Sequence, residues 1–510
     1  MTFKRQTIIN LISNYANTTF VIVTSIVMVP LYLKYFNMDV YGAWMASGNI
    51  VGMLGLLDGG INLVMTQRLS VAHANNDPRE FSKYFTSGVI VSLAFTVLIP
   101  IICLYYSGSV PRMINYHVDY QRDEIILAFS LASIGAFMSF NYSTLSTAYQ
   151  ALGNVTETAI VSLSIAIIGV VSTILSLRFG WGITSLAIGQ LVRPSLGVFC
   201  LIILMIPIWR RKVGTVLIFD LKKIVYMLKT SMFIMATRLV GQLAGNAESL
   251  ILSNMIDTRT AGIWAVSSRS ISVIGGLMAP IGSSMFAPIA KKFTTQQLHE
   301  SWKLISKYIV AISTISIILL STAVAMNGTF VGLWVGYQNY AGVECDILNA
   351  FAVYFVARIS FSGLIIAAKG NNKTSSFCSS VGSIAQLGTV FMLVSQLGII
   401  GLPLSKIIGS AIITLPLIAY YQAKIFRVEY YVSAKINYAG LLMLVVTTAI
   451  ASIVSILTLY YLANWFAWVS VSVLAFSIIC FYMYNMNDSL RIVYENNFKP
   501  RLISVFTSAR

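Results

Sequence analysis

Charged side chains are scarce in this sequence. Only 10% of its 510 residues are charged and 57% are hydrophobic, whereas a soluble domain carries about 25% charged residues. A soluble chain of this length needs a polar surface that so few charges would not cover. The scarcity excludes a soluble globular protein and makes lipid the expected solvent for most of the chain.

Cysteine, histidine and long polar segments are scarce as well. The chain has five cysteines and three histidines, none of them spaced like a pair of ligands, so we expect neither a disulfide framework nor a metal site. The longest predicted outer segments, residues 107–123 and 327–346, are too short for a soluble catalytic domain. An enzyme acting at the outer face would have to build its site from the ends of spans, which disfavours an enzyme.

Long apolar runs dominate what is present. Stretches of about 20 apolar residues are long enough to cross a bilayer, and about fourteen of them predict an all-α, polytopic membrane protein. The expected spans are 8–33, 40–65, 85–106, 124–146, 159–177, 182–208, 224–252, 260–289, 304–326, 347–368, 377–397, 398–422, 437–462 and 465–486.

The basic residues predict the orientation of these spans. The net charge is +17, and the excess of lysine and arginine gathers in alternate loops. By the positive-inside rule these loops and both termini are cytoplasmic. The cations would meet the headgroups of membrane lipids. We expect no nucleic-acid partner, because no basic, aromatic-rich face lies on a soluble module.

An internal repeat divides the chain. Three motifs recur at an offset of about 220 residues: Tyr41-Gly42-Ala43-Trp44 with Ala261-Gly262-Ile263-Trp264, Gly153-Asn154 with Gly370-Asn371, and Gly182-Ile183 with Gly401-Leu402. The repeat predicts two six-helix lobes related by a pseudo-twofold axis, with the substrate between them. The expected parts are an N-lobe 1–208, a basic cytoplasmic connector 209–223, a C-lobe 224–422, two accessory spans 437–486 and a cytoplasmic tail 487–510.

Seven ionisable residues fall inside the predicted spans. Such residues are costly in lipid and usually face a cavity or a partner. They are Asp58, Arg193, Arg238, Glu248, Arg269, Arg358 and Lys406. The cations outnumber the acids, which suits an anionic ligand, and the guanidinium fork fits phosphate oxygens.

Helical spacing refines this set of candidates. Arg238, Gln242 and Ser249 fall on one stripe of the seventh span, which predicts a polar face there. Arg238 and Arg358 lie nearest the expected midplane, where a side chain reaches the surface least easily. We therefore take these two as the first candidates for binding an anionic head group.

Each buried charge also has a structural interpretation. Glu248 and Asp58 could each neutralise a nearby arginine, and Arg269 and Lys406 could extend to the outer surface. Arg193 could hold carbonyls freed by the proline that follows it. Asp58 has a further interpretation, in which its protonation or sodium binding couples transport to an ion gradient.

Several segments resemble a known family. Asn14, Pro30-Leu31-Tyr32, Tyr41-Gly42-Ala43-Trp44, Leu56-Leu57-Asp58-Gly59-Gly60 and Gln150-Ala151-Leu152-Gly153-Asn154 look like the corresponding segments of bacterial O-antigen flippases (Wzx type). These proteins form the polysaccharide-transporter branch of the multidrug/oligosaccharidyl-lipid/polysaccharide (MOP) exporter superfamily. The likeness extends over the whole chain through short motifs.

The resemblance implies a fold and a function. It implies a MOP/MATE-like fold in the bacterial inner membrane, and translocation of an undecaprenyl-pyrophosphate-linked oligosaccharide from the cytoplasmic to the periplasmic leaflet by alternating access. Coupling to a proton or sodium gradient is part of this expectation, as are a polysaccharide polymerase and a chain-length regulator as partners. The alternatives are a multidrug exporter of the same superfamily, a membrane O-antigen polymerase or ligase, and a scaffolding protein.

Overall fold

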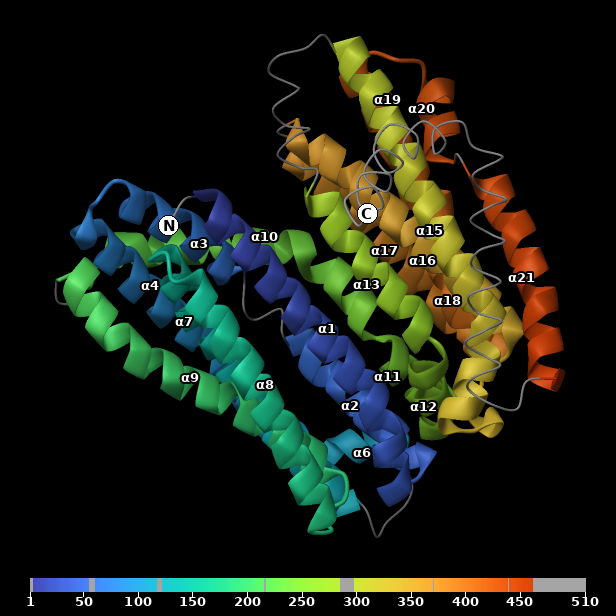
Figure 1. The fold of residues 1–510 in the computed structure, drawn as a ribbon, viewed down its shortest axis with the longest axis horizontal. Coiled ribbons are helices and arrows are strands. Elements are labelled where there is room, and N and C mark those ends of the chain that lie inside the picture. The colour runs from blue at the N-terminus through green and yellow to red at the C-terminus, as the bar shows by residue number, and fades with distance from the viewer. Residues whose placement is uncertain are drawn as a thin grey trace, which may run out of the picture. The chain divides into compact units, whose positions relative to one another are not determined.

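The computed structural model describes residues 3–54, 60–116, 122–214, 217–284, 298–369, 371–438 and 440–461. Throughout these ranges the regular secondary structure is helical (Figure 1). The all-α fold class predicted from the apolar runs is therefore confirmed. The chain forms two compact units, residues 1–262 and 263–510.

The first unit contains the N-terminal helices. They are α1 (Phe3–Tyr35), α2 (Met38–Leu54), α3 (Ile61–Ala74), α4 (Pro78–Thr96), α5 (Leu98–Tyr106), η2 (Ser107–Ser109), α6 (Val110–Met113), α7 (Arg122–Ala151), α8 (Val155–Arg178), α9 (Thr184–Lys212), α10 (Leu221–Asn246), α11 (Glu248–Met255) and the start of α12 (Thr258–Ser267). Within this unit α10 packs against α2, α3 and α4. The first compact unit thus extends beyond the predicted connector, 209–223, and includes α10.

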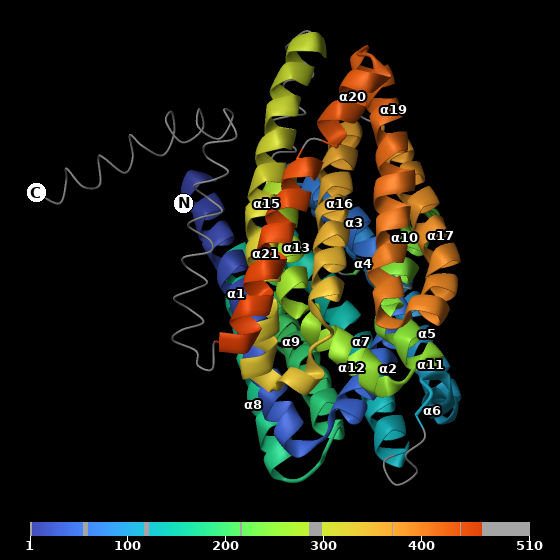
Figure 2. The same cartoon turned by 90° about the vertical axis from the view of Figure 1, so that its right-hand side faces the viewer.

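The second unit contains the remaining helices. They are the end of α12, α13 (Arg269–Ser284), α15 (Leu298–Val335), η4 (Tyr337–Asn339), α16 (Val343–Ala368), α17 (Asn372–Leu397), η5 (Gly398–Ile400), α18 (Gly401–Ile407), the π-helix η6 (Ile408–Thr414), α19 (Leu415–Phe426), α20 (Tyr430–Asn437) and α21 (Leu441–Tyr461). In this unit α15 packs along α16 and α21, and α17 along α18 (Figure 2).

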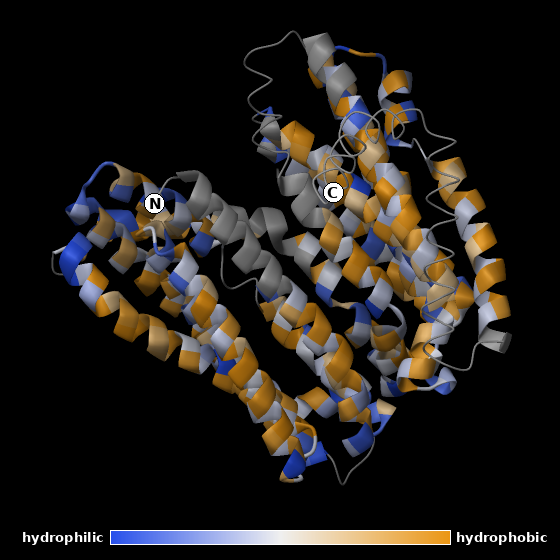
Figure 3. Cartoon of the chain, in the orientation of Figure 1, coloured by the Kyte–Doolittle hydropathy of each residue, from blue (hydrophilic) through white to orange (hydrophobic). Residues whose placement is uncertain are grey.

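The helices are long and apolar enough to cross a membrane. Among the described residues eight have the required length and hydropathy. Many large apolar side chains along the helices are exposed, and Figure 3 colours their hydrophobic residues orange. Seven of the eight each match one predicted span, and residues 373–426 contain the predicted spans 377–397 and 398–422. The predicted division between those two is confirmed, because α17 ends at Leu397 and α18 begins at Gly401.

Other predicted spans differ from continuous helices. The second span, 40–65, includes most of α2 and the start of α3, and Gly60 before α3 has a φ of 70°. The seventh span is divided between α10 and α11, and the eighth between α12 and α13. The predicted outer segment 327–346 shrinks to 336–342, since α15 ends at Val335 and α16 begins at Val343. The fourteenth predicted span, 465–486, and the tail 487–510 lie outside the described residues.

The second repeated motif folds the same way twice. Asn154 has φ −98° and ψ 48°, and Asn371 has φ −95° and ψ 51°. The Asn154 amide donates to the Tyr149 carbonyl at 3.4 Å, and the Asn371 amide donates to the Ile366 carbonyl at 3.3 Å. At both sites the asparagine therefore precedes its helix with the same backbone conformation, as an internal repeat would produce.

The first repeated motif makes a reciprocal contact within the first unit. A Cβ on Gly42 would lie 1.7 Å from the Thr258 carbonyl oxygen, and a Cβ on Gly262 would lie 2.8 Å from the Met38 carbonyl oxygen. Residues 38 and 42 correspond to 258 and 262 in the repeat. The contact is thus equivalent in both directions, and glycine at both positions lets the two backbones touch.

Each unit also has a glycine crossing that the sequence analysis did not identify. In the first unit, a Cβ on Gly189 of α9 would lie 3.0 Å from the Gly169 carbonyl oxygen of α8. In the second, a Cβ on Gly382 of α17 would lie 2.5 Å from the Gly409 carbonyl oxygen and 1.7 Å from the Thr414 hydroxyl. Small residues at these crossings allow the close helix packing that replaces the hydrophobic effect in lipid.

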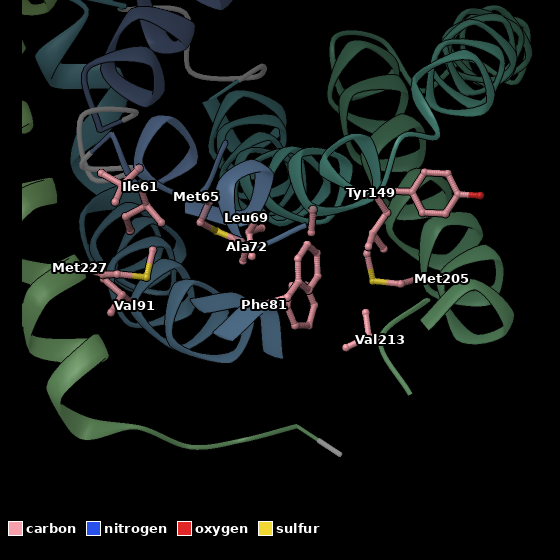
Figure 4. Close-up of a cluster of buried hydrophobic side chains, with 14 of the residues drawn as sticks. Ile61, Met65, Leu69, Ala72, Phe81, Val91, Tyr149, Met205, Val213 and Met227 are labelled. Atoms are coloured by element: carbon pink, nitrogen blue, oxygen red, sulfur yellow. The ribbon is translucent and has the colours of Figure 1, made fainter. Parts of the chain in front are cut away.

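One end of the first unit has an apolar core. Figure 4 shows side chains of α3 and α4, among them Met65 and Phe81, together with Tyr149 from α7, Met205 from α9 and Met227 from α10. Residues far apart in the sequence thus share one buried cluster. Burial of this cluster fixes the adjacent ends of five helices relative to one another.

An ion-pair cluster attaches the predicted connector to this core. The Lys223 ammonium donates to the Glu80 carboxylate at 2.8 Å and to the Tyr84 hydroxyl at 3.0 Å. Both hydrogen bonds raise the pKa of Lys223. Nearby, the Ile218 amide donates to the Ser82 hydroxyl at 3.0 Å. The described part of the connector is therefore bound to α4 rather than suspended between the units.

The α17 crossing predicts a large effect for a small substitution. Gly382→Ala would place a methyl group inside the contact with η6, so we expect it to destabilise the protein by about 1–3 kcal/mol or more. Gly388→Ala is the matched control on the same helix, because a Cβ there meets no atom within 4 Å. Thermal unfolding in detergent measures both. Equal midpoints for the two variants would contradict the close crossing.

Candidate functional site

Arg193 lies among three helices of the first unit. It is partly buried in α9, where its Cβ lies 2.9 Å from the position of a Cβ on Gly169 of α8. It interacts electrostatically with Tyr142 of α7. Pro194 has no N–H, so the Gln190 carbonyl lacks its helical donor, and Gly135 lets that carbonyl approach α7. The predicted role of Arg193 stays a prediction.

The break between α10 and α11 is held by a side chain of α2. The Asn49 Oδ1 accepts hydrogen bonds from the Ser249 amide at 2.9 Å and the Leu250 amide at 3.2 Å. It thereby caps the first turn of α11 from another helix. The Asn246 side chain donates to the Gly52 carbonyl at 3.4 Å. Ser249, on the predicted polar stripe, and Asn246, next to it, thus both contact α2.

Glu248 begins α11 and is partly buried. A carboxylate at this position interacts favourably with the helix dipole. Asp58 lies outside the described residues. Arg238 and Gln242 belong to α10, but their side chains also lie outside what the structure describes.

Lys406 and Arg269 lie in the second unit near the break between α12 and α13. The Lys406 ammonium is 5.4 Å from the centre of the Trp264 ring, a distance at which cation–π attraction is effective. Arg269 is the first residue of α13, and its Nε is buried with no hydrogen-bond partner among the described residues. A buried donor in this state has capacity for an acceptor that the described residues do not supply.

A buried polar network holds this break, and the sequence analysis did not identify it. The Asn327 Nδ2 donates to the Ser267 carbonyl and to Asp346 Oδ1, both at 2.8 Å. Asn327 Oδ1 accepts from the Ser270 hydroxyl at 2.6 Å, and Asp346 Oδ2 accepts from the Tyr340 hydroxyl at 2.7 Å. The network connects α12, α13, α15 and α16. Asp346 is only 2% exposed.

The sequence contained a partial signal for Asp346. It follows Gly342 and opens an apolar run, where an acidic residue is favourable in the first helical turn. Because residue 346 falls in the predicted outer segment 327–346, the sequence does not predict that Asp346 is buried. In the loop before α16, burial and the neighbouring Asp346 carboxyl raise the pKa of Tyr340, so the phenol stays a hydrogen-bond donor.

The Arg358 guanidinium is held by hydrogen bonds to other groups of the protein. Its Nε donates to the Asn437 carbonyl at 3.1 Å and its Nη1 to the Ile309 carbonyl at 2.7 Å. Nη1 also donates to the Ser313 hydroxyl, and Nη2 donates to the Ile436 carbonyl. The guanidinium is 2% exposed and joins α16 to α15 and to the C-terminus of α20, where a cation is favourable.

These contacts give Arg358 a structural role in the described conformation. We expect Arg358→Met to lower the stability by about 3 kcal/mol or more, since a single hydrogen bond to a charged group contributes about 1.5–3 kcal/mol. Arg427→Met is the control, because Arg427 is an exposed arginine of the same unit. Thermal unfolding in detergent compares them. An Arg358→Met protein that unfolds like the wild type but fails to transport would instead favour a ligand-binding role.

The described cations among the sequence-predicted site residues have different surroundings. Lys406 and Arg269 both lie by the break of the second unit, Arg358 is bound to α15 and α20, and Arg193 is in the first unit. The grouping of Arg193, Arg238, Gln242, Arg269, Arg358 and Lys406 around one head group stays a prediction.

Solved structures with the same fold are transporters. The chain is similar to the lipid II flippase MurJ in an inward closed conformation, with a TM-score of 0.69 and 15% identity over 94% of this chain and 99% of that chain. It is also similar to an inward-facing MATE family multidrug resistance transporter of the MOP superfamily, with a TM-score of 0.63 and 13% identity over 81% and 94% of the two chains. A eukaryotic MATE transporter, AtDTX14, has a TM-score of 0.60 and 12% identity over 85% and 97%.

These likenesses confirm the predicted MOP/MATE-like fold. No curated protein matches the chain. The sequence profile of a family described as "Polysaccharide biosynthesis protein" matches residues 4–293, more than half of the chain. The family match agrees with the resemblance carried by the N-terminal motifs, and the helices are those of a multi-pass membrane protein. The chain belongs to the polysaccharide biosynthesis protein family and has the fold of MOP-superfamily transporters.

Proposed function

We propose that this protein moves an undecaprenyl-pyrophosphate-linked oligosaccharide, an O-antigen or related surface polysaccharide unit, from the cytoplasmic to the periplasmic leaflet of the bacterial inner membrane. The observation that carries the proposal is an excess of cations over acids in the predicted spans of a chain from this family. A lipid II flippase with the same fold supports a lipid-linked substrate. Both termini would be cytoplasmic, in line with the distribution of basic loops.

The structure supports Arg269 and Lys406 as the best candidates for the anionic head. Arg269 has a buried Nε without a described partner, and the Lys406 ammonium lies 5.4 Å from the centre of the Trp264 ring, which places a second cation beside the same break. Both lie at a helix break, where transporters commonly place their binding sites. Arg193, Arg238 and Gln242 are the further candidates, and Arg358 would act by holding α16 in place.

The proposal predicts a specific loss of transport. In proteoliposomes, we expect Arg269→Gln and Lys406→Gln each to slow leaflet transfer of the lipid-linked oligosaccharide roughly 10- to 100-fold, since one charge-assisted hydrogen bond contributes about 1.5–3 kcal/mol. Arg259→Gln is the matched control, an exposed arginine at the start of α12. Equal transfer by all three variants, with thermal stability unchanged, would place the head group elsewhere.

Asp58 and Glu248 are proposed to couple transport to a proton or sodium gradient, or to neutralise nearby cations. Asp58→Asn removes the charge at nearly constant size. If Asp58 is the coupling group, we expect transfer by this variant to lose its dependence on an imposed pH or sodium gradient. A normal response to both gradients would exclude the coupling role of Asp58.

Multidrug export is the second candidate function, because a MATE multidrug transporter shares the fold. Cationic drugs would favour an anionic cavity, whereas the ionisable residues inside the predicted spans are mainly cationic. Wild-type protein that exports cationic dyes but transfers no lipid-linked glycan would select this alternative. A polysaccharide polymerase and a chain-length regulator are the proposed partners, as consumers of the flipped unit.

A further inference from the structure

The short helix α20 has two faces of different character. It lies between α19 and α21 and packs against the ends of α19 and α15 (Figures 1 and 2). Ser433 and Asn437, one turn apart, are completely buried. On the opposite side Tyr431 is 70% exposed, and Lys435, one turn further on, is exposed as well. The helix therefore has one buried face and one exposed face.

The buried face is held by the hydrogen bonds of Asn437. Asn437 Nδ2 donates to Gln422 Oε1 at 2.7 Å and to the Ser433 carbonyl at 2.9 Å, and Asn437 Oδ1 accepts from the Ser362 hydroxyl at 2.9 Å. Arg358 holds the last carbonyls of α20. With its inner face so fixed, the helix presents one defined outer face.

The outer face has the composition of a membrane interface. Tyr430, Tyr431 and Val432 are 49%, 70% and 38% exposed, a pattern that suits the boundary between headgroups and acyl chains better than water. Because α20 is a short link between two apolar helices, α19 and α21, it stays close to the level at which those helices leave the bilayer.

The charges around this face fit an anionic partner. Lys424, Arg427 and Lys435 are exposed, and Glu429 is the exposed carboxylate of the same segment, 424–438. Basic residues next to the cytoplasmic end of a span are attracted to anionic lipid headgroups. Tyrosine and lysine on one exposed face combine the two contacts that an interfacial helix makes.

We propose that α20 is an interfacial helix that binds anionic phospholipid headgroups. Tyr430, Tyr431 and Val432 lie at the headgroup boundary, and Lys424, Arg427 and Lys435 contact the phosphates. Because Arg358 and Asn437 connect α20 to α15 and α16, the bound lipid stabilises the inner ends of those helices. This surface is separate from the proposed transport site and does not depend on which substrate is carried.

Hydrogen exchange of the full chain in nanodiscs tests the proposal. Amides of residues 428–438 should exchange roughly tenfold more slowly when phosphatidylglycerol is added to phosphatidylcholine, because opening of α20 must then break headgroup contacts. The triple variant Lys424→Gln/Arg427→Gln/Lys435→Gln should lose this difference while keeping the thermal stability of the wild type in detergent.

A matched variant controls for total charge. Arg210→Gln/Arg211→Gln/Lys222→Gln removes three exposed cations of the first unit and should leave the lipid dependence of residues 428–438 intact. The proposal is overturned if wild-type exchange in this segment is the same with and without phosphatidylglycerol. It is also overturned if the control variant loses the difference as completely as the α20 variant.

Discussion

In a bilayer, a buried polar group has to find its partner within the protein, because hydrocarbon offers none. Two buried ionisable side chains of this structure follow that constraint closely. Arg358 donates to three main-chain carbonyls and a hydroxyl, and Asp346 accepts from an asparagine and a tyrosine. These buried ionisable groups are satisfied by neutral partners, and each therefore joins several helices at once. Arg269 differs from these two, since its buried Nε has no partner among the described residues, and we therefore propose it as the better candidate for a ligand.

The same constraint explains where helices break. The exposed amides of a broken helix need acceptors, and Asn49 supplies one to the start of α11. At the α12–α13 break, Asn327 donates to the Ser267 carbonyl. An asparagine from a neighbouring helix therefore stabilises each of these two breaks, α10–α11 and α12–α13. Such breaks bring backbone dipoles to membrane depth, where a transporter can use them for its substrate.

Much of the fold could be predicted from the sequence because apolar length and glycine turns are local signals. The Gly-Asn motif predicted a repeat, and Asn154 and Asn371 have nearly the same dihedral angles. The partners of Arg358 could not be predicted, since they come from α15 and α20, far away in the sequence. The roles of Asn49, Asn327 and Asp346 could not be predicted for the same reason. Each role depends on which helix lies opposite, and no periodicity within one span encodes that.

We propose that Arg269 and Lys406 recognise the charge of the pyrophosphate. The most direct test of this proposal compares leaflet transfer of one oligosaccharide carried either by undecaprenyl pyrophosphate or by an uncharged polyprenol lipid, in proteoliposomes of the wild-type protein. The account predicts transfer of the pyrophosphate-linked form and little or none of the uncharged form. Equal transfer of the two would show that the glycan or the lipid tail is recognised instead, and would contradict the role given to Arg269 and Lys406.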